Sequence, residues 1–324
     1  MYKRQAPGDV TITGADISAN SLSTKGNLTT DSPLTIGGTA TCAGTMNTSS
    51  YMAVFGDLVS TSFTCNGELR VKGDLTGELN ATTLILDGSY KQYVYGTVKT
   101  SYLEIRNTSS SGVQIDGSVY ASISYKNTGV PVKGNAVHVG EGGMNVEVDT
   151  ELSGDQTVDG ALNLKNSSMR IDGSLNASKG LSLENAQLII TGDLIVGGGS
   201  IVLDGNSSLT IVRQARIQNA AVTQDGTMSV GSDLYLSSSP ITGGGSLTLN
   251  GDLVTTGQIT QQTLTLGGKV RQYIDGGQVN VRDLILENSS KGGVYLQSKI
   301  YYSGSLDPGS TAVTNEQNLI KEAA

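Results

Sequence analysis

The stretch GALNLKNSSMRIDGSLNASK (160–179) is followed by GLSLENAQLIITGDLIVGG (180–198) and GSIVLDGNSSLTIV (199–212), and the three segments repeat one pattern. Apolar and polar residues alternate over short runs, and Gly, Asn, Asp or Ser ends each run, as in β-strands joined by turns. The segments start 19 to 20 residues apart, and so short a unit cannot bury its apolar face alone. The pattern therefore predicts a β-solenoid, whose stacked coils share one core.

The same alternation continues over residues 6–313. It predicts an all-β, single-stranded parallel β-helix of about 15 coils with roughly 20 residues each. The usual handedness of crossover connections favours right-handed coils. The chain has 43 glycines among 324 residues, two Phe and no Trp, which indicates frequent turns around a narrow aliphatic core.

A longer repeat relates residues 67–125 to residues 245–306. GELRVKGDL at the start of the first copy matches GSLTLNGDL at the start of the second, and Gln92-Tyr93 matches Gln272-Tyr273. We interpret 6–313 as a continuous solenoid that contains an internal duplication of several coils.

The two ends depart from the repeat. MYKRQ (1–5) is basic and aperiodic, and we interpret it as the translation of a sequencing adapter, so that the chain is a fragment without its own N-terminus or signal peptide. Residues 314–324 combine a polar N-cap with good helix formers and predict a short helix. This tail either caps the solenoid or begins a linker to a further domain.

Four asparagines follow two apolar residues at a spacing of two. Residues so spaced in a strand point to one face, so we expect each asparagine to turn inward where its strand ends. Stacked on neighbouring coils, such side chains form a structural ladder that satisfies the amides and the turn. The alternative is an ordinary turn that faces solvent. The candidates are Asn107, Asn166, Asn185 and Asn288.

Two further motifs invite a chemical interpretation. Gly-Asp-Leu recurs at 56–58, 73–75, 192–194 and 251–253 without the nonapeptide spacing of calcium-binding rolls, which favours turn chemistry for its aspartates. Cys42 and Cys65 occupy similar frames 23 residues apart. If one enlarged coil separates them, a disulfide is within reach; otherwise both are buried thiols of the core.

Tyrosine is the one enriched aromatic residue. Tyr90, Tyr93 and Tyr95 cluster in one segment, and the second copy retains Tyr273 beside a cation. Tyr93 and Tyr95 share a face, so these residues are candidates for glycan contact through ring stacking. The alternative is a row of outward tyrosines that stiffens a sheet face.

Composition argues against several classes of function. A net charge of −8 gives no electrostatic footprint for nucleic acid, and no long apolar run predicts a membrane span in this segment. The single histidine, His138, has no nucleophile motif beside it. Carboxylate pairs such as Asp155 with Asp159, or Glu184 with Asp204, do not stand out from the acidic residues at other turns. We expect no catalysis, no metal and no cofactor.

The segments GSYKQYVYGTVKTSYLEIRNTSSSGVQIDGSVY (88–120) and GGKVRQYIDGGQVNVRDLILENSSKGGVYLQSKIYYSGSL (267–306) resemble repeats of large secreted bacterial surface proteins. In that family a glycine, a glutamine and a hydrophobic pair lead into L-x-I-x-N-x-S-S-x-G-V. The resemblance implies an extracellular, wall-associated or adhesive role. The G-D-L motifs are also similar to those of bactofilins, cytoplasmic proteins that polymerise end to end, although bactofilin cores are shorter and more regular.

These observations predict a non-catalytic, structural or adhesive β-solenoid segment of a bacterial surface protein, located outside the cell. Its expected partners are further copies of itself, bound end to end or laterally, or cell-surface glycans. Two alternatives stay open. One is a β-helix that binds or cleaves polysaccharides, and the other is a bactofilin-like scaffold that forms polymers.

Overall fold

The structure is a computed structural model that describes residues 3–14 and 16–322. It is a parallel β-solenoid of about 16 turns with 60% of its residues in strands, which confirms the predicted fold class. The chain divides into two units, Met1–Ser153 (unit 1) and Gly154–Ala324 (unit 2), and each is described by itself. Among the described residues, no helix is long and apolar enough to cross a membrane.

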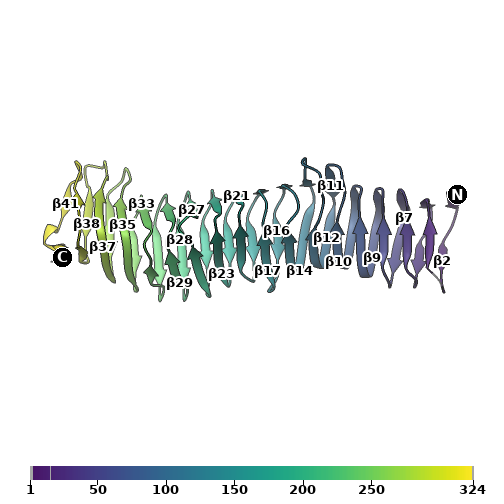
Figure 1. Cartoon of the computed structure of the whole chain (residues 1–324), viewed down its shortest axis with the longest axis horizontal. Coiled ribbons are helices and arrows are strands. Elements are labelled where there is room, and N and C mark those ends of the chain that lie inside the picture. Colours follow the sequence, from purple (N-terminus) through teal and green to yellow (C-terminus); the bar gives the residue numbers. More distant parts are fainter. Residues whose placement is uncertain (1–2, 15, 323–324) are drawn as a thin grey trace. The chain divides into compact units, whose positions relative to one another are not determined.

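Unit 1 consists of short strands that lie side by side, from the purple to the teal part of the ribbon (Figure 1). The strands are β1 (Lys3–Ala6), β2 (Val10–Ile12), β3 (Ile17–Ala19), β4 (Ser21–Thr24), β5 (Leu28–Thr30), β6 (Leu34–Ile36), β7 (Ala40–Thr48), β8 (Met52–Val54), β9 (Leu58–Val71), β10 (Leu75–Leu86), β11 (Gln92–Tyr95), β12 (Thr97–Ile105), β13 (Val113–Ile115), β14 (Ser118–Asn127), β15 (Val132–Gly134), β16 (Val137–Val139), β17 (Gly143–Val146) and β18 (Thr150–Ser153).

The core of unit 1 is a set of columns with one apolar side chain per coil. Each strand pairs in parallel with the strand one coil further on, so that Leu69, Leu84 and Leu103 lie opposite one another on β9, β10 and β12. All three are at most 2% exposed. Burial of a leucine contributes about 1.5–3 kcal/mol, so the columns supply most of the stabilisation of the unit.

The N-terminal strand extends this pairing into the stretch that the sequence excludes from the fold. Lys3–Ala6 form β1, which pairs in parallel with β4. The remaining part of the proposed adapter, Met1 and Tyr2, lies outside the described residues. The ladder of unit 1 therefore begins within residues 1–5.

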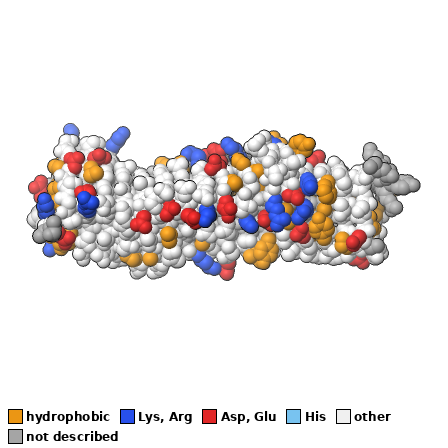
Figure 2. All heavy atoms as spheres, in the orientation of Figure 1, with side chains coloured by type: hydrophobic (Ala, Val, Ile, Leu, Met, Phe, Trp, Pro, Cys, Tyr) orange, Lys and Arg blue, Asp and Glu red, His pale blue; other side chains and the backbone are white. Residues whose placement is uncertain are grey.

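The outer face over β12 and β14 carries charges of both signs (Figure 2). Glu104 lies 2.6 Å from the Arg106 guanidinium and 3.7 Å from the Lys126 ammonium. The hydrogen bond from Arg106 lowers the pKa of Glu104. Exposed pairs of this kind contribute little to stability, but they leave no patch of a single sign here.

Unit 2 has the same construction, and each strand again pairs with the strand one coil on. The strands are β19 (Gln156–Val158), β20 (Leu162–Lys165), β21 (Ser168–Asp172), β22 (Leu175–Ala177), β23 (Gly180–Glu184), β24 (Gln187–Ile190), β25 (Leu194–Val196), β26 (Ser200–Leu203), β27 (Ser208–Ile211), β28 (Ala215–Gln218), β29 (Ala221–Gln224), β30 (Thr227–Val230), β31 (Leu234–Ser237), β32 (Ile241–Thr242), β33 (Ser246–Leu249), β34 (Leu253–Thr255), β35 (Gln258–Leu266), β36 (Gln272–Asp275), β37 (Gln278–Leu286), β38 (Val294–Leu296), β39 (Ile300–Tyr302), β40 (Leu306–Asp307), β41 (Val313–Thr314) and β42 (Leu319–Lys321).

The short helix predicted over 314–324 is wrong. Within the described part of this segment, residues 314–322, the single helical element is a 3-10 turn at Glu316–Asn318, and β42 follows it. Leu319 pairs with Ile300 of β39, which in turn pairs with Val279, so the tail adds another rung to an apolar column of unit 2. Stacking on an existing coil outweighs the weak helix propensity of so short a segment.

Candidate functional site

Two buried amide side chains fix the loop before β11 in unit 1. Asn107 is 0% exposed, and its Nδ2 donates to the Tyr90 carbonyl (3.0 Å) and to Gln92 Oε1 (3.1 Å). Gln92, 1% exposed, uses its Nε2 to donate to the main-chain carbonyls of Val71 (3.0 Å) and Gly73 (2.7 Å) in the preceding coil. We call Gln92 and Asn107 the polar corner of unit 1. Its hydrogen bonds tie the loop to the coils on both sides.

This corner displays a segment at the edge of the coil, residues 89–95, which comprises the end of that loop and strand β11 (Figure 1); we call it the aromatic loop. Tyr90 is 81% exposed. The rings of Tyr93 and Tyr95 stack with their centroids 5.5 Å apart and an angle of 5° between their planes. Lys91 places its ammonium 4.8 Å from the centre of the Tyr93 ring. The arrangement is a stacked pair of parallel rings with a cation over the Tyr93 ring, on a segment held by the polar corner.

The duplicated segment of unit 2 builds an equivalent polar corner. Asn288 Nδ2 donates to the carbonyls of Gly267 (3.0 Å) and Val270 (2.8 Å). Gln272 Nε2 donates to the carbonyls of Leu249 (3.2 Å) and Gly251 in the preceding coil. In this copy no described atom pairs with Gln272 Oε1, whereas Gln92 Oε1 accepts from Asn107. In both copies, therefore, the side-chain amides of a glutamine and an asparagine donate to main-chain carbonyls and so hold the loop against its coil.

The aromatic loop of unit 2, residues 269–275, differs in how its rings are arranged. Tyr273 pairs with Tyr295 one coil on, with centroids 5.6 Å apart and planes tilted by 52°. The guanidinium of Arg271 lies 5.3 Å from the first ring centre and 5.0 Å from the second. Of the four candidate tyrosines, the structure therefore stacks only Tyr93 with Tyr95. Tyr273 is held against the neighbouring Arg271, the cation noted in the sequence, and against Tyr295, which the sequence did not single out.

The G-D-L aspartates hold successive coils together, a role that the sequence did not reveal. In each case Oδ1 accepts a hydrogen bond from a main-chain N–H of the next coil. The pairs are Asp57 with Asp74 (2.8 Å), Asp74 with Tyr93 (2.8 Å), Asp193 with Gln214 (3.4 Å) and Asp252 with Tyr273 (2.8 Å). The residue separation along these pairs ranges from 17 to 21, which shows how far coil length varies around the predicted value.

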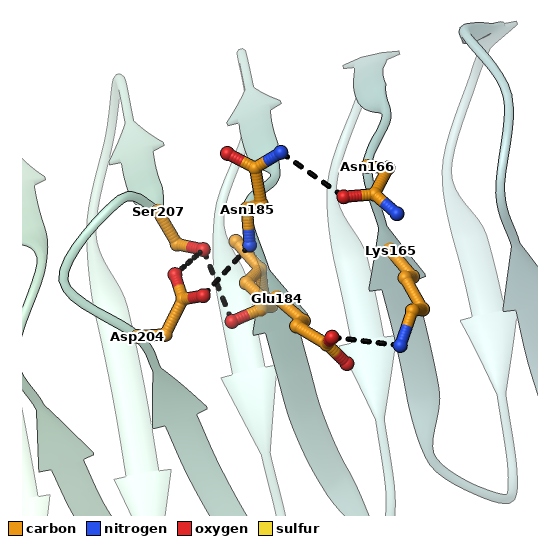
Figure 3. Close-up of polar contacts among 7 residues, drawn as sticks. Lys165, Asn166, Glu184, Asn185, Asp204 and Ser207 are labelled. Atoms are coloured by element: carbon orange, nitrogen blue, oxygen red, sulfur yellow. Dashed lines mark hydrogen bonds and ion pairs between the residues drawn. The ribbon is translucent and has the colours of Figure 1, made fainter.

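The prediction that all four asparagines face inward is wrong for Asn166 and Asn185 of unit 2. Both are exposed, and both adopt a left-handed backbone with φ of 49°. This conformation ends the alternation of the strand, so Ser167 and Ala186 take the inward positions instead. The two asparagines still stack, because Asn185 Nδ2 donates to Asn166 Oδ1 at 3.0 Å (Figure 3).

Asp204 supports the same turn from the next coil of unit 2 (Figure 3). Its carboxylate accepts from the Ser207 hydroxyl and from the Asn185 N–H (2.9 Å). The Ser207 hydrogen bond and the turn amides lower the pKa of Asp204.

A carboxylate with a lowered folded pKa stabilises the fold above its unfolded pKa of about 3.9, and this contribution disappears as the pH falls through the folded value. We therefore expect Asp204→Asn to reduce the stability of the turn at neutral pH and to narrow its difference from the wild type in acid. Hydrogen exchange of the Asn185 amide between neutral and acidic pH measures this. An equal difference at both ends of the range would contradict it.

Both cysteines are free thiols, so the candidate disulfide between Cys42 and Cys65 is wrong. Cys42 lies opposite Ser60, whereas Cys65 lies opposite Thr48, because each occupies a different column of the coil. The similar frames TATCAG and SFTCNG are therefore not in structural register. Burial raises the pKa of the Cys65 thiol, which keeps it protonated and unreactive.

We expect alkylation without reductant to add two labels to the unfolded protein and to proceed slowly in the folded protein, since both thiols are buried. Mass spectrometry of labelled wild type and of Cys42→Ala, which should take one label when unfolded, measures this. Failure of the unreduced, unfolded wild type to take up label would restore the disulfide.

The candidate carboxylates serve the fold. Glu184 accepts from Lys165 Nζ at 2.7 Å, Asp204 supports its turn, and Asp155 accepts from the Ser174 N–H at 2.8 Å. Among the described residues, no three His, Cys, Asp or Glu side chains gather in a way that could hold a metal ion. The strongest candidate site is thus the aromatic loop on its polar corner.

No family model matches the chain, and no curated protein or solved structure does either.

Proposed function

We propose that this chain is a structural and adhesive segment of a bacterial surface protein, located outside the cell and without catalytic activity. The observation that carries the proposal is the construction of each unit. Apolar columns and aspartate hydrogen bonds join successive coils, while the exposed loops carry tyrosines and cations. A scaffold of stacked coils that holds its exposed loops in place suits display and contact rather than turnover.

Self-association and the absence of turnover are directly testable. Analytical ultracentrifugation and electron microscopy over a concentration series should detect end-to-end or lateral assembly. A reducing-sugar assay on plant and microbial polysaccharides should detect no product. Release of reducing ends would replace the proposal with polysaccharide cleavage. A strictly monomeric protein at the highest concentration would remove self-association and with it the bactofilin-like alternative.

Glycan binding by the aromatic loop is the second candidate function. The parallel stack of Tyr93 on Tyr95 favours it, since Tyr95 is 40% exposed and an exposed ring of a fixed stack offers an apolar face to a sugar. On a glycan array, we expect the double variant Tyr93→Ala/Tyr95→Ala to lose about tenfold or more in signal. Tyr102→Ala removes an exposed tyrosine outside the stack, and it should leave the signal unchanged. Equal loss in both would reject a site at the stack.

A further inference from the structure

A groove of neutral polar side chains runs along unit 1, away from the aromatic loop. Two adjoining hollows of about 380 and 300 Å³ share Thr64 and Asn66 in their linings and so form one continuous groove. One wall presents a single outward side chain per coil, in register from β2 to β12. These side chains are Thr11, Thr29, Asn47, Thr64, Asn80 and Lys99.

The groove follows the bend of the long strands. Its floor includes Cys65, Ala81 and Thr100, which lie opposite one another on β9, β10 and β12. The register shifts directly after two of these floor residues, between Ala81 and Thr83 and between Thr100 and Tyr102. Such irregularities bend a strand and so bring the side chains before and after the bend toward a common hollow.

The wall side chains are not used by the fold. In the part of the chain that the structure describes, no protein group forms a hydrogen bond with the side chains of Asn47, Thr64 or Asn80. The opposite wall differs, because the Thr82 hydroxyl donates to the Asn66 carbonyl at 2.9 Å. From Thr11 to Asn80 the first wall therefore offers one uncommitted hydroxyl or amide per coil, each able both to donate and to accept, and Lys99 adds a donor at the next coil.

An aromatic ring continues this wall beyond Lys99. Tyr120 lies opposite Lys99 on the next strand, is 40% exposed, and lines the same hollow. Its ring is held by an edge-to-face contact with His138, with the centroids 4.6 Å apart. Tyr120 thus presents a fixed aromatic surface at one end of a row of polar groups.

The small number of charged residues in the groove restricts the class of ligand that it can bind. Lys99 and Asp31 are the two charged residues that line it, so it lacks the cluster of cations that a phosphate backbone requires. Its strands are paired on both sides, so an added peptide strand finds no free edge there. We propose that the groove binds a neutral, unbranched glycan chain, whose hydroxyls pair with the wall and whose sugar ring stacks on Tyr120. This inference deepens the proposed adhesive function by naming a ligand class.

Isothermal titration calorimetry with cellohexaose, xylohexaose and laminarihexaose tests the proposal on the full chain. We expect saturable binding of at least one, weakened about tenfold or more by Asn80→Leu and by Tyr120→Ala. Asn176→Leu places the same change on an exposed strand position of unit 2 and should bind like the wild type. Circular dichroism of each variant checks that the coil is intact.

Four outcomes would overturn the proposal that the groove binds a neutral glycan. One is no binding of any of the three oligosaccharides, and another is equally tight binding by the Asn80 and Tyr120 variants. The third is loss of binding in Tyr93→Ala/Tyr95→Ala alone, which would move the ligand to the aromatic loop. Tighter binding of hexagalacturonate would reject a neutral ligand. None of these results depends on the assembly experiment, so failure of the adhesive scaffold and failure of the groove are distinguishable.

Discussion

Replacing Gly77 with alanine should destabilise unit 1 by about 3 kcal/mol or more. Gly77 lies in β10 where the register shifts between Thr76 and Glu78, and its φ is +122°. A Cβ at this position would overlap the Ser60 carbonyl oxygen of the neighbouring coil. The backbone strain and the overlap add, because Ser60 belongs to β9, which is itself held in place by its pairing with β7.

Hydrogen exchange with denaturant is the suitable measurement, since a solenoid opens locally and one global unfolding energy is poorly defined. Protection should fall most in β9 and β10. The control is Gly205→Ala, because a Cβ on Gly205 would meet nothing within 4 Å. Equal protection in the two variants would show that coil stacking at Gly77 is loose enough to admit a methyl group.

The variant Asn107→Ala should cost about 2–4 kcal/mol in local stability, because each buried polar group left unpaired costs roughly 1–3 kcal/mol. The change removes the donor to the Tyr90 carbonyl and to Gln92 Oε1, and the acceptor for the Ser109 N–H. We expect residues 87–95 to lose protection against exchange and to become sensitive to protease, while the apolar columns of unit 1 persist.

Asn185→Ala is the matched control, since Asn185 follows two apolar residues at the same spacing as Asn107 but is exposed. Its loss should cost only about 1 kcal/mol, mainly because alanine fits the left-handed backbone at this position less well than asparagine does. Asn288→Ala should reproduce the large effect in unit 2, where the equivalent amide is 1% exposed. Similar costs for Asn107→Ala and Asn185→Ala would contradict the distinction between inward and outward asparagines.

The period and the apolar alternation are sufficient to predict the solenoid, because burial requires only that side chains spaced by two point inward. The same rule places Asn107 correctly and Asn185 incorrectly. The difference is the left-handed backbone at Asn185, which nothing in the pattern L-x-L-x-N specifies. Spacing therefore predicts the face of a residue only while the strand continues.

Spacing along the chain does not predict features that depend on which residues lie opposite one another on neighbouring coils. Cys42 and Cys65 have similar neighbours but different opposite residues, because coil length varies at the turns. The polar groove depends in the same way on which residues a bend brings together across several coils. The aromatic pair Tyr93 and Tyr95 was predictable, since both belong to one strand and their relation is local.

The G-D-L hydrogen bonds have a direction. In all four, the carboxylate belongs to the earlier coil and the main-chain amide that it binds belongs to the later one. When a chain leaves a ribosome or a translocation pore N-terminus first, the carboxylate of each earlier coil is therefore in place before the main-chain amide that it binds. If the coils form in this order, each new coil would add to a finished one, and each bound amide would oppose slippage of the chain relative to the coil before it.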